Sequence, residues 1–425
     1  MLSLGRISGA FGIRVASKGI AFVSSALLAV WLSPEGFGAF SFAMASAGLT
    51  TTVALGGLDR LAIRMAAAPA HEGQRAEYLS VRRGLWRRLQ LNASLASGGL
   101  LLVLALMVFT NARPYVFVVL VMAPSVAATA ITSVSSALLL CFSRLKEGLV
   151  PDLVVRPIAF LAAIGAVWLV AGRLSASVAA GLYSVAALSA CALTWWLLQR
   201  QERVGLPHQG VGPIDVDWKE ESRGFFRYAA VNALTTNLDL VILGFLLDAS
   251  ELGVYALATR LASIGPVAIA AIDANLAPIV ARATSGRDSE SIRHVLLRAT
   301  AIGFAINTAL LVAALLGAHQ VLQFFGPGFE GAFRPLAIFC LANVVISLLW
   351  TSQLALTMSR QTNVVTMVMM AWLTIYVAAV LLVAPRYGMV AAAAALAAVQ
   401  AGIHVSLTVV ARRSAFSLVS TGART

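Results

Sequence analysis

The sequence predicts an all-α membrane protein with about twelve transmembrane helices, arranged as two six-helix bundles related by a parallel pseudo-two-fold repeat. Three observations lead to this fold class. The 425 residues are 60% hydrophobic and only 12% charged, with a mean hydropathy of +0.87, which leaves too little polar surface to cover a soluble globule. Long runs without a charged residue recur along the chain, and one short turn sequence occurs twice.

The apolar runs set the number of spans. A spanning helix needs about 20 mostly apolar residues, at 1.5 Å rise each, to cross about 30 Å of hydrocarbon. Several charge-free runs reach this length, and four other segments contain only a few charges. No strand-like alternation indicates a β-barrel. We predict spans at about residues 10–32, 37–57, 89–110, 115–140, 152–171, 175–198, 226–247, 252–281, 296–317, 333–358, 362–384 and 388–411. The first is expected to stay in the mature chain, because it has no small-residue cleavage site.

The basic residues indicate how the chain is oriented. The joint between the second and third spans holds Arg60, Arg64, Arg75, Arg82, Arg83, Arg87 and Arg88, whereas the joints on the opposite side hold only Arg113, Arg173, Arg334 and Arg386. By the positive-inside rule, both termini and the basic joints should face the cytoplasm. The net charge of +13 then reflects topology and contact with anionic lipids. Nucleic acid is not an expected partner, because no soluble basic domain presents these side chains.

The repeated turn indicates a duplication. "WLSPEGFGAF" at residues 31–40 resembles "LLDASELGVY" at 246–255, and both follow a first span. The alignment pairs Leu32 with Leu247, Gly38 with Gly253, Phe40 with Tyr255 and Ala43 with Ala258. Six spans per half place both halves in the same orientation. We therefore expect an N-terminal bundle at 1–198, a polar cytoplasmic linker at 199–224 and a C-terminal bundle at 225–425, although short matches also arise by chance in such apolar chains.

Longer stretches carry a family resemblance. "LSPEGFGAFSFAMA", "LGGLDRLAIR", "NLDLVILGFLLDASELGVYALATRLASI", "ANLAPIVA" and "FFGPGFEGAFRPLAIFCLANVV" resemble the polysaccharide transporters of the multidrug/oligosaccharidyl-lipid/polysaccharide exporter superfamily, which includes the Wzx-type O-antigen flippases. The resemblance covers nearly the whole chain. It implies alternating access around a central cavity and transfer of undecaprenyl-pyrophosphate-linked oligosaccharides, for lipopolysaccharide or exopolysaccharide, between leaflets of the bacterial inner membrane. Implied partners are membrane lipids, a polysaccharide polymerase and a chain-length regulator.

Basic residues inside spans are candidates to bind a pyrophosphate head, because an ionisable group at the bilayer centre usually faces a cavity or a partner. Arg260 lies near the middle of the eighth span, and Arg14 and Lys18, four residues apart, share a face of the first. Guanidinium groups give bidentate contacts to phosphate, and Lys gives a mobile point charge. The alternatives are snorkelling of Arg14 and Lys18 to the interface, and a structural ion pair of Arg260 with Asp239.

Acidic and amide residues suggest ion coupling and gating. Asp239 and the nearby Asn237 in the seventh span are candidates for coupling to a proton or cation, or equally for a hydrogen bond between helices. Asp59, Arg60, Arg64 and Asp273 fall near cytoplasmic helix ends and are interpreted as interfacial residues or gate residues. Pro266 and Pro278 are expected to kink or break the eighth span.

Other chemistry is not indicated. The three Cys and five His are scattered without metal-ligand spacing, and no phosphate-cradling GxxxxGK[ST] motif occurs, so no cofactor, metal or ATP-driven step is predicted. An enzyme of glycan polymerisation is not expected, because the outward joints are short and hold no catalytic carboxylate pair. The remaining alternative is a cation-coupled small-molecule or multidrug antiporter of the same superfamily, against which the basic residues argue.

Overall fold

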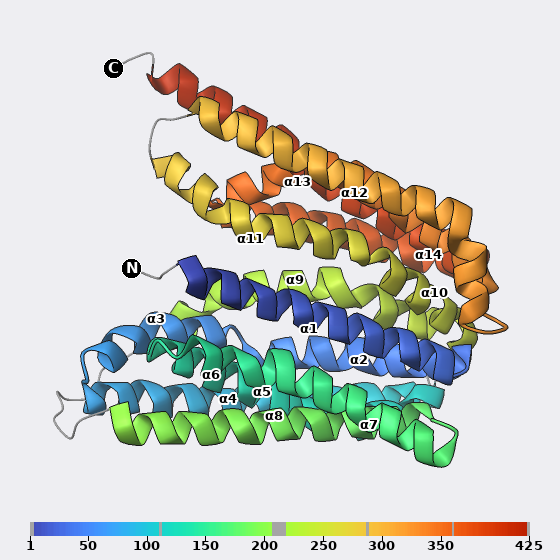
Figure 1. Cartoon of the computed structure of the whole chain (residues 1–425), viewed down its shortest axis with the longest axis horizontal. Helices are drawn as coiled ribbons and strands as arrows, with labels where there is room; N and C mark the ends of the chain where they lie inside the picture. The colour runs from blue at the N-terminus through green and yellow to red at the C-terminus, as the bar shows by residue number, and fades with distance from the viewer. Residues whose placement is uncertain (1–3, 110–112, 206–217, 286–288, 359–360, 423–425) are drawn as a thin grey trace. The chain divides into compact units, whose positions relative to one another are not determined.

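The all-α membrane fold is confirmed by a computed structural model, which describes residues 4–109, 113–205, 218–285, 289–358 and 361–422. Within these ranges every regular element is a helix (Figure 1). Eleven helical segments are long and apolar enough to cross a membrane. The last of them, Thr362–Arg413, is too long for one crossing, and Gly388 interrupts it with non-helical angles (φ 68°, ψ −160°). Division there gives the twelve predicted spans.

The contacts divide the chain into two units, Met1–Ala249 and Ser250–Thr425. The first unit contains α1 (Leu4–Trp31), α2 (Pro34–Leu55), α3 (Leu58–His71), α4 (Arg75–Met107), η1 (Arg113–Tyr115), α5 (Val116–Cys141), α6 (Leu145–Val150), η2 (Pro151–Val155), α7 (Arg156–Ala171), α8 (Ala176–Gly205) and α9 (Trp218–Leu246). The second contains α10 (Ala249–Ala262), α11 (Ile264–Ser285), α12 (Ser289–Phe324), η3 (Glu330–Ala332), α13 (Phe333–Met358) and α14 (Thr362–Gly422).

In the first unit, α5 is the central helix and packs against α8, α2 and α3 (Figure 1). A cluster of buried side chains fills the space between α3, α4 and α5, with Leu58, Leu61, Tyr78, Leu85 and Leu138 fully enclosed. The helix α9 packs along α2 and is therefore part of this unit. The predicted bundle boundary at residues 199–224 stays a prediction, and residues 206–217 of that linker lie outside the described ranges.

The repeated turn begins a helix in both places. Ser33 caps α2 by accepting a hydrogen bond from the Gly36 amide (3.1 Å), and Pro34 occupies the first helical turn, where its missing N–H costs nothing. The second copy leads into α10. Each of the four aligned pairs is buried in both copies: Leu32 and Leu247, Gly38 and Gly253, Phe40 and Tyr255, and Ala43 and Ala258. The duplication itself stays a prediction.

In the second unit, α13 packs against α12, α14 and α11. The predicted eighth span is broken at Ser263, so that α10 ends at Ala262 and α11 begins at Ile264 with Pro266 in its first turn. The break is thus where the proline predicts it, whereas α11 continues through residue 278. Ile269 and Leu276 of α11 pack with Trp350 and Leu354 of α13.

Candidate functional site

The two basic residues predicted on the first span, Arg14 and Lys18, both have exposed side chains on α1. The ring of Trp31, at the end of this helix, stacks on Trp168 of α7, with centroids 5.1 Å apart. Lys18 lies 13 residues before Trp31 and Arg14 lies 17 before it, which is about 20 Å and 26 Å along the helix. Because Trp residues favour the interface, this spacing puts Lys18 about two thirds of the way across a hydrocarbon layer of about 30 Å, and Arg14 close to its opposite side.

These two cations have no acidic partner among the residues whose side chains are described. Salt bridges among the described residues join Arg82 to Glu202, Arg144 to Glu147 and Arg156 to Asp152. The helix α1 packs against α7, η2, α6 and α2. A buried or membrane-facing cation without a carboxylate is unfavourable unless an aqueous cavity or a bound anion compensates it. Arg14 and Lys18 are therefore suited to hold an anionic group.

A further charged pair inside the first unit joins Arg156 and Asp152. The guanidinium of Arg156 lies 3.2 Å from the Asp152 carboxylate, donates to the Thr129 hydroxyl at 3.3 Å, and lies 5.8 Å from the centre of the Tyr183 ring. Arg156 is 12 residues before Trp168, about 18 Å along the helix and close in depth to Lys18. Asp152 lies on η2, a π-helical turn of the kind that often marks a functional site, and Arg156 is the first residue of α7.

Sequence reasoning missed this pair because the predicted fifth span begins at residue 152, which puts Asp152 and Arg156 in its first turns. The signal was present in "PDLVVRP", where an acid and a base four residues apart share one helical face. The structure shows that α6, η2 and α7 form one continuous segment, Leu145–Ala171, so the pair lies well inside it.

The predicted coupling residues Asp239 and Asn237 face different directions on α9. The Asn237 amide donates to the Ala233 carbonyl (3.1 Å) and to the Thr236 hydroxyl (3.0 Å), and it lies against Gly48 of α2. Two residues along a helix correspond to a rotation of about 200°, so Asp239 lies on the other side of α9. Its side chain is buried, with 9% of its surface exposed. Asn237 thus contributes to helix packing, and Asp239 is the buried titratable group.

The predicted gate residues of the first unit lie on α3, a short amphipathic helix after two glycines with positive φ, Gly56 (54°) and Gly57 (78°). Gly57 packs against the backbone of α9, where a Cβ would collide with Phe225 and Phe226. Arg60 lies over the ring of Tyr228, 4.9 Å from its centre. Asp59 is half-buried and Arg64 is exposed. The helix α3, which follows α2 in the chain, packs against α9.

In the second unit, Arg260 is half-buried one turn before the break between α10 and α11. Its carbonyl accepts hydrogen bonds from the Ser263 hydroxyl (2.6 Å) and the Ser263 amide (3.2 Å). Asp273 is half-buried on α11, and one of its carboxylate oxygens is enclosed without a hydrogen-bond partner among the described groups.

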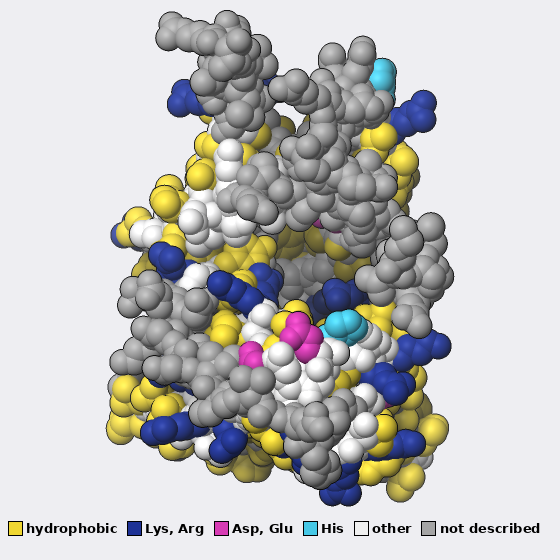
Figure 2. All heavy atoms as spheres, turned by 90° about the vertical axis from the view of Figure 1, so that its left-hand side faces the viewer, with side chains coloured by type: hydrophobic (Ala, Val, Ile, Leu, Met, Phe, Trp, Pro, Cys, Tyr) yellow, Lys and Arg dark blue, Asp and Glu magenta, His cyan; other side chains and the backbone are white. Residues whose placement is uncertain are grey.

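No metal cluster of three or more His, Cys, Asp or Glu side chains occurs in the described part of the chain. Figure 2 shows Lys and Arg side chains spread over the face where α4 begins and α8 ends, with apolar side chains at its flanks.

The fold is shared with solved transporters. An inward-facing multidrug resistance transporter of the MATE family superposes with a TM-score of 0.75 at 10% identity, covering 95% of this chain and 96% of that one. Lipid II flippase MurJ, in an inward closed conformation, gives 0.68 at 12% identity, covering 93% and 86%. The MATE transporter DinF-BH in complex with R6G gives 0.66 at 13% identity, covering 97% and 94%. At these identities the likeness establishes the fold.

Family membership comes from the sequence itself. No curated protein matches this chain. Residues 9–284, well over half of its length, match the family described as polysaccharide biosynthesis protein. The matched segment includes α1 with Arg14 and Lys18, the pair on η2 and α7, and Asp239 on α9. The chain therefore belongs to the polysaccharide biosynthesis protein family.

Proposed function

We propose that this protein is a flippase that moves an undecaprenyl-pyrophosphate-linked oligosaccharide from the inner to the outer leaflet of the bacterial cytoplasmic membrane. The family supports a role in polysaccharide biosynthesis, and the fold is one that a solved lipid II flippase also has. One observation carries the proposal: Arg14 and Lys18 present exposed cations on α1, at membrane depth, without a described acidic partner. A pyrophosphate supplies the missing negative charge.

Three residues are proposed to bind the headgroup. Arg14 contributes a planar guanidinium that contacts two phosphate oxygens at once, and Lys18 contributes a flexible point charge four residues further along the same face. Arg260 is the proposed contribution of the second unit. Arg156 differs from Arg14 and Lys18 because Asp152 already neutralises it, so we assign it a role in positioning η2 and α8 beside α1.

Alternating access needs a bias between inward and outward states, because a ligand shifts such an equilibrium only by its differential affinity for the two states. We propose that protonation or cation binding at the buried Asp239 supplies it, with Asn237 holding α9 against α2. Asp59, Arg60, Arg64 and Asp273 are proposed gate residues. Both termini are proposed to be cytoplasmic, and a polymerase and a chain-length regulator are the proposed protein partners.

A cation-coupled multidrug antiporter is the second candidate, favoured by the fold shared with MATE transporters. Such a transporter needs acidic and aromatic side chains to accept cationic compounds. The exposed charged side chains on α1, Arg14 and Lys18, are basic, so we favour the flippase.

The deciding experiment measures on which leaflet undecaprenyl-pyrophosphate glycans reside in cells that lack this gene, using a membrane-impermeant glycan-labelling reagent. Glycans should accumulate on the cytoplasmic face. The wild-type gene and Lys18→Arg should restore outward transfer, whereas Lys18→Gln should lower it by about tenfold, the effect of losing one charge-assisted contact.

Lys146→Gln is the matched control, because Lys146 is an exposed lysine at the start of α6. This variant should transfer glycans like the wild type. Normal labelling on the outer face of cells without the gene would overturn the flippase. Efflux of cationic compounds would then be measured in the same strains.

A further inference from the structure

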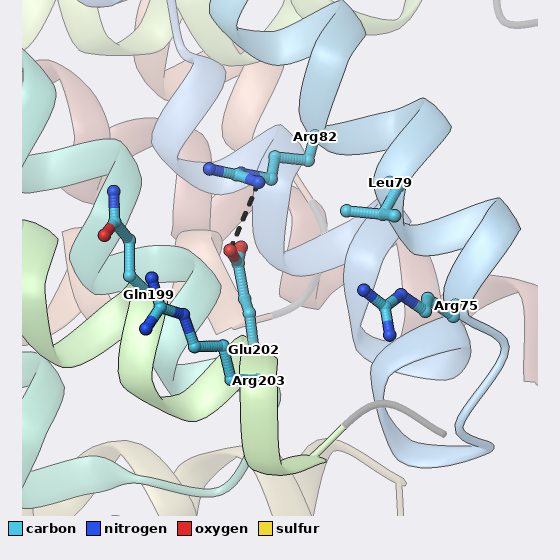
Figure 3. A pocket seen from close by; sticks show the side chains of 6 residues that line it. All are labelled: Arg75, Leu79, Arg82, Gln199, Glu202 and Arg203. Carbon is cyan, nitrogen blue, oxygen red and sulfur yellow. Dashed lines mark ion pairs between the residues drawn. The ribbon is translucent and has the colours of Figure 1, made fainter. Parts of the chain in front are cut away.

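A second basic site lies at one end of the first unit, away from the groups on α1. A cavity of about 260 Å³ is lined by Arg75, Leu79 and Arg82 of α4 and by Gln199, Glu202 and Arg203 of α8 (Figure 3). On α4 these residues are four and three positions apart, and on α8 Glu202 and Arg203 lie three and four positions after Gln199, so each set lies along one side of its helix. Arg82 and Glu202 point toward one another across the cavity, and Arg75 extends into the gap.

The wall of this cavity is held rigidly. The hydroxyl of Tyr78, which is fully buried, donates to one oxygen of Glu202 at 2.8 Å, and Arg82 lies 3.2 Å from the other oxygen. The Arg82 guanidinium also lies over the ring of Trp195, 5.8 Å from its centre. Both oxygens of Glu202 are thereby engaged, so the positions of Arg82 and Glu202 are fixed before any ligand binds.

The lining of the cavity is rich in arginine. Three arginines against one carboxylate give the lining a formal charge of +2. The side chain of Gln199 adds an amide donor to the lining. Planar guanidinium groups around a small polar cavity match the geometry of a phosphate group.

The position of the cavity indicates where the phosphate comes from. The apolar segment that begins at Arg75 runs to Ala105, and 31 helical residues span about 46 Å, which exceeds the hydrocarbon layer of about 30 Å. The first two turns of α4, which carry Arg75 and Arg82, therefore reach the headgroup layer. The last turns of α8 meet them there, so the cavity opens where lipid phosphates lie.

We infer that this cavity binds the phosphate group of an anionic membrane lipid, held between α4 and α8 by Arg75, Arg82 and Arg203. Such a lipid links the two helices in a way that a zwitterionic lipid does not, because the positive lining repels a headgroup cation. The inference is independent of what the protein transports and is tested without a transport assay.

The test is a titration of the purified full-length protein, in a neutral detergent, with phosphatidylglycerol, with phosphatidylcholine and with inorganic phosphate, followed by native mass spectrometry. Phosphatidylglycerol should bind more tightly than phosphatidylcholine. Arg203→Gln should weaken this binding about fivefold, the factor expected for one basic residue beside an anionic lipid surface. Glu202→Gln should tighten it by a similar factor, because the negative charge is removed from the lining.

Two results would overturn the inference. In Arg87→Gln, the matched control, an exposed arginine on the same helix but outside the cavity is neutralised. A loss of binding there equal to that in Arg203→Gln would show a general surface effect. Binding of inorganic phosphate with the same variant pattern, but without preference for phosphatidylglycerol, would rule out the lipid as the source. The opposite signs expected for Glu202→Gln and Arg203→Gln exclude misfolding as a common cause.

Discussion

The side chain of Asn343 on α13 donates a hydrogen bond to the backbone carbonyl of Ala262, 2.9 Å away, at the point where α10 ends. A helix end leaves carbonyl groups without partners in the helix, and in an apolar bundle water does not reach them readily. Asn343 is itself buried, with 8% of its surface exposed. The break between α10 and α11 is thus fixed from a neighbouring helix.

Replacing this amide should destabilise the second unit. We expect Asn343→Ala to lower the free energy of unfolding by about 1–3 kcal/mol, because the Ala262 carbonyl loses its side-chain donor. Thermal unfolding of the purified protein in detergent measures the effect. Asn363→Ala, at an exposed amide on α14, is the control and should unfold like the wild type. Equal stability of both variants would mean that another group satisfies the carbonyl.

The contact between α2 and α9 depends on a glycine. A Cβ at Gly244 would overlap the ring of Phe42, so Gly244→Ala should cost about 1–3 kcal/mol of stability through overpacking. Phe42→Leu in the same chain should recover part of the loss. At Gly165 on α7 no atom lies within 4 Å of the added Cβ, and Gly165→Ala should leave stability unchanged or raise it by up to about 1 kcal/mol. Denaturant titrations of the variants compare them.

The pair of Asp152 and Arg156 should show strong coupling. Both side chains are only partly buried, with 27% and 20% of their surfaces exposed, so breaking the pair should cost about 1–3 kcal/mol, between the values for surface and buried pairs. Asp152→Asn and Arg156→Gln should each show this loss, and the double variant should lose less than their sum. Strictly additive losses in this double-mutant cycle would contradict a direct interaction.

The hydroxyl of Tyr78 should stabilise the junction of α4 and α8. Tyr78→Phe removes the donor to Glu202 and should lower the free energy of unfolding by about 1.5–3 kcal/mol, the range for hydrogen bonds to charged groups. Tyr387, with 72% of its surface exposed, provides the comparison, and Tyr387→Phe should have no effect. Equal unfolding temperatures for Tyr78→Phe and Tyr387→Phe would contradict this prediction and would mean that water replaces the Tyr78 hydroxyl at Glu202.

Much of this fold follows from one-dimensional features of the chain. The length of an apolar run is enough to identify a span, and the break before Pro266 and the helix start at Ser33 follow from local chemistry. The short helix α3 was not predicted, because its charges made the whole stretch after Gly57 resemble a polar joint. Its amphipathic pattern becomes clear only once Leu58 and Leu61 are seen buried against α5.

The charged residues were harder to interpret, because sequence gives their depth but not their neighbours. Asn237 and Asp239, two residues apart, face different sides of α9 by helix geometry, but only the structure shows that Asn237 lies against Gly48 of α2. No role for Arg156 was predicted from the sequence, since the continuity of α6, η2 and α7 depends on a π-helical turn that no sequence pattern specified. The position of a charged residue within a span makes it a candidate for a binding site. Whether another side chain already neutralises it depends on contacts that only the structure shows.

The spacing of Asp152 and Arg156 within one segment also matters for how the chain enters the membrane. Each charge alone would add about 2.5–3.5 kcal/mol to the insertion of this segment. Because both partners lie on the same helix, four residues apart, their pairing needs only that helix to form and does not wait for Thr129 or Tyr183. The segment Leu145–Ala171 can therefore enter the membrane with Arg156 already neutralised by Asp152, before α8 packs against it.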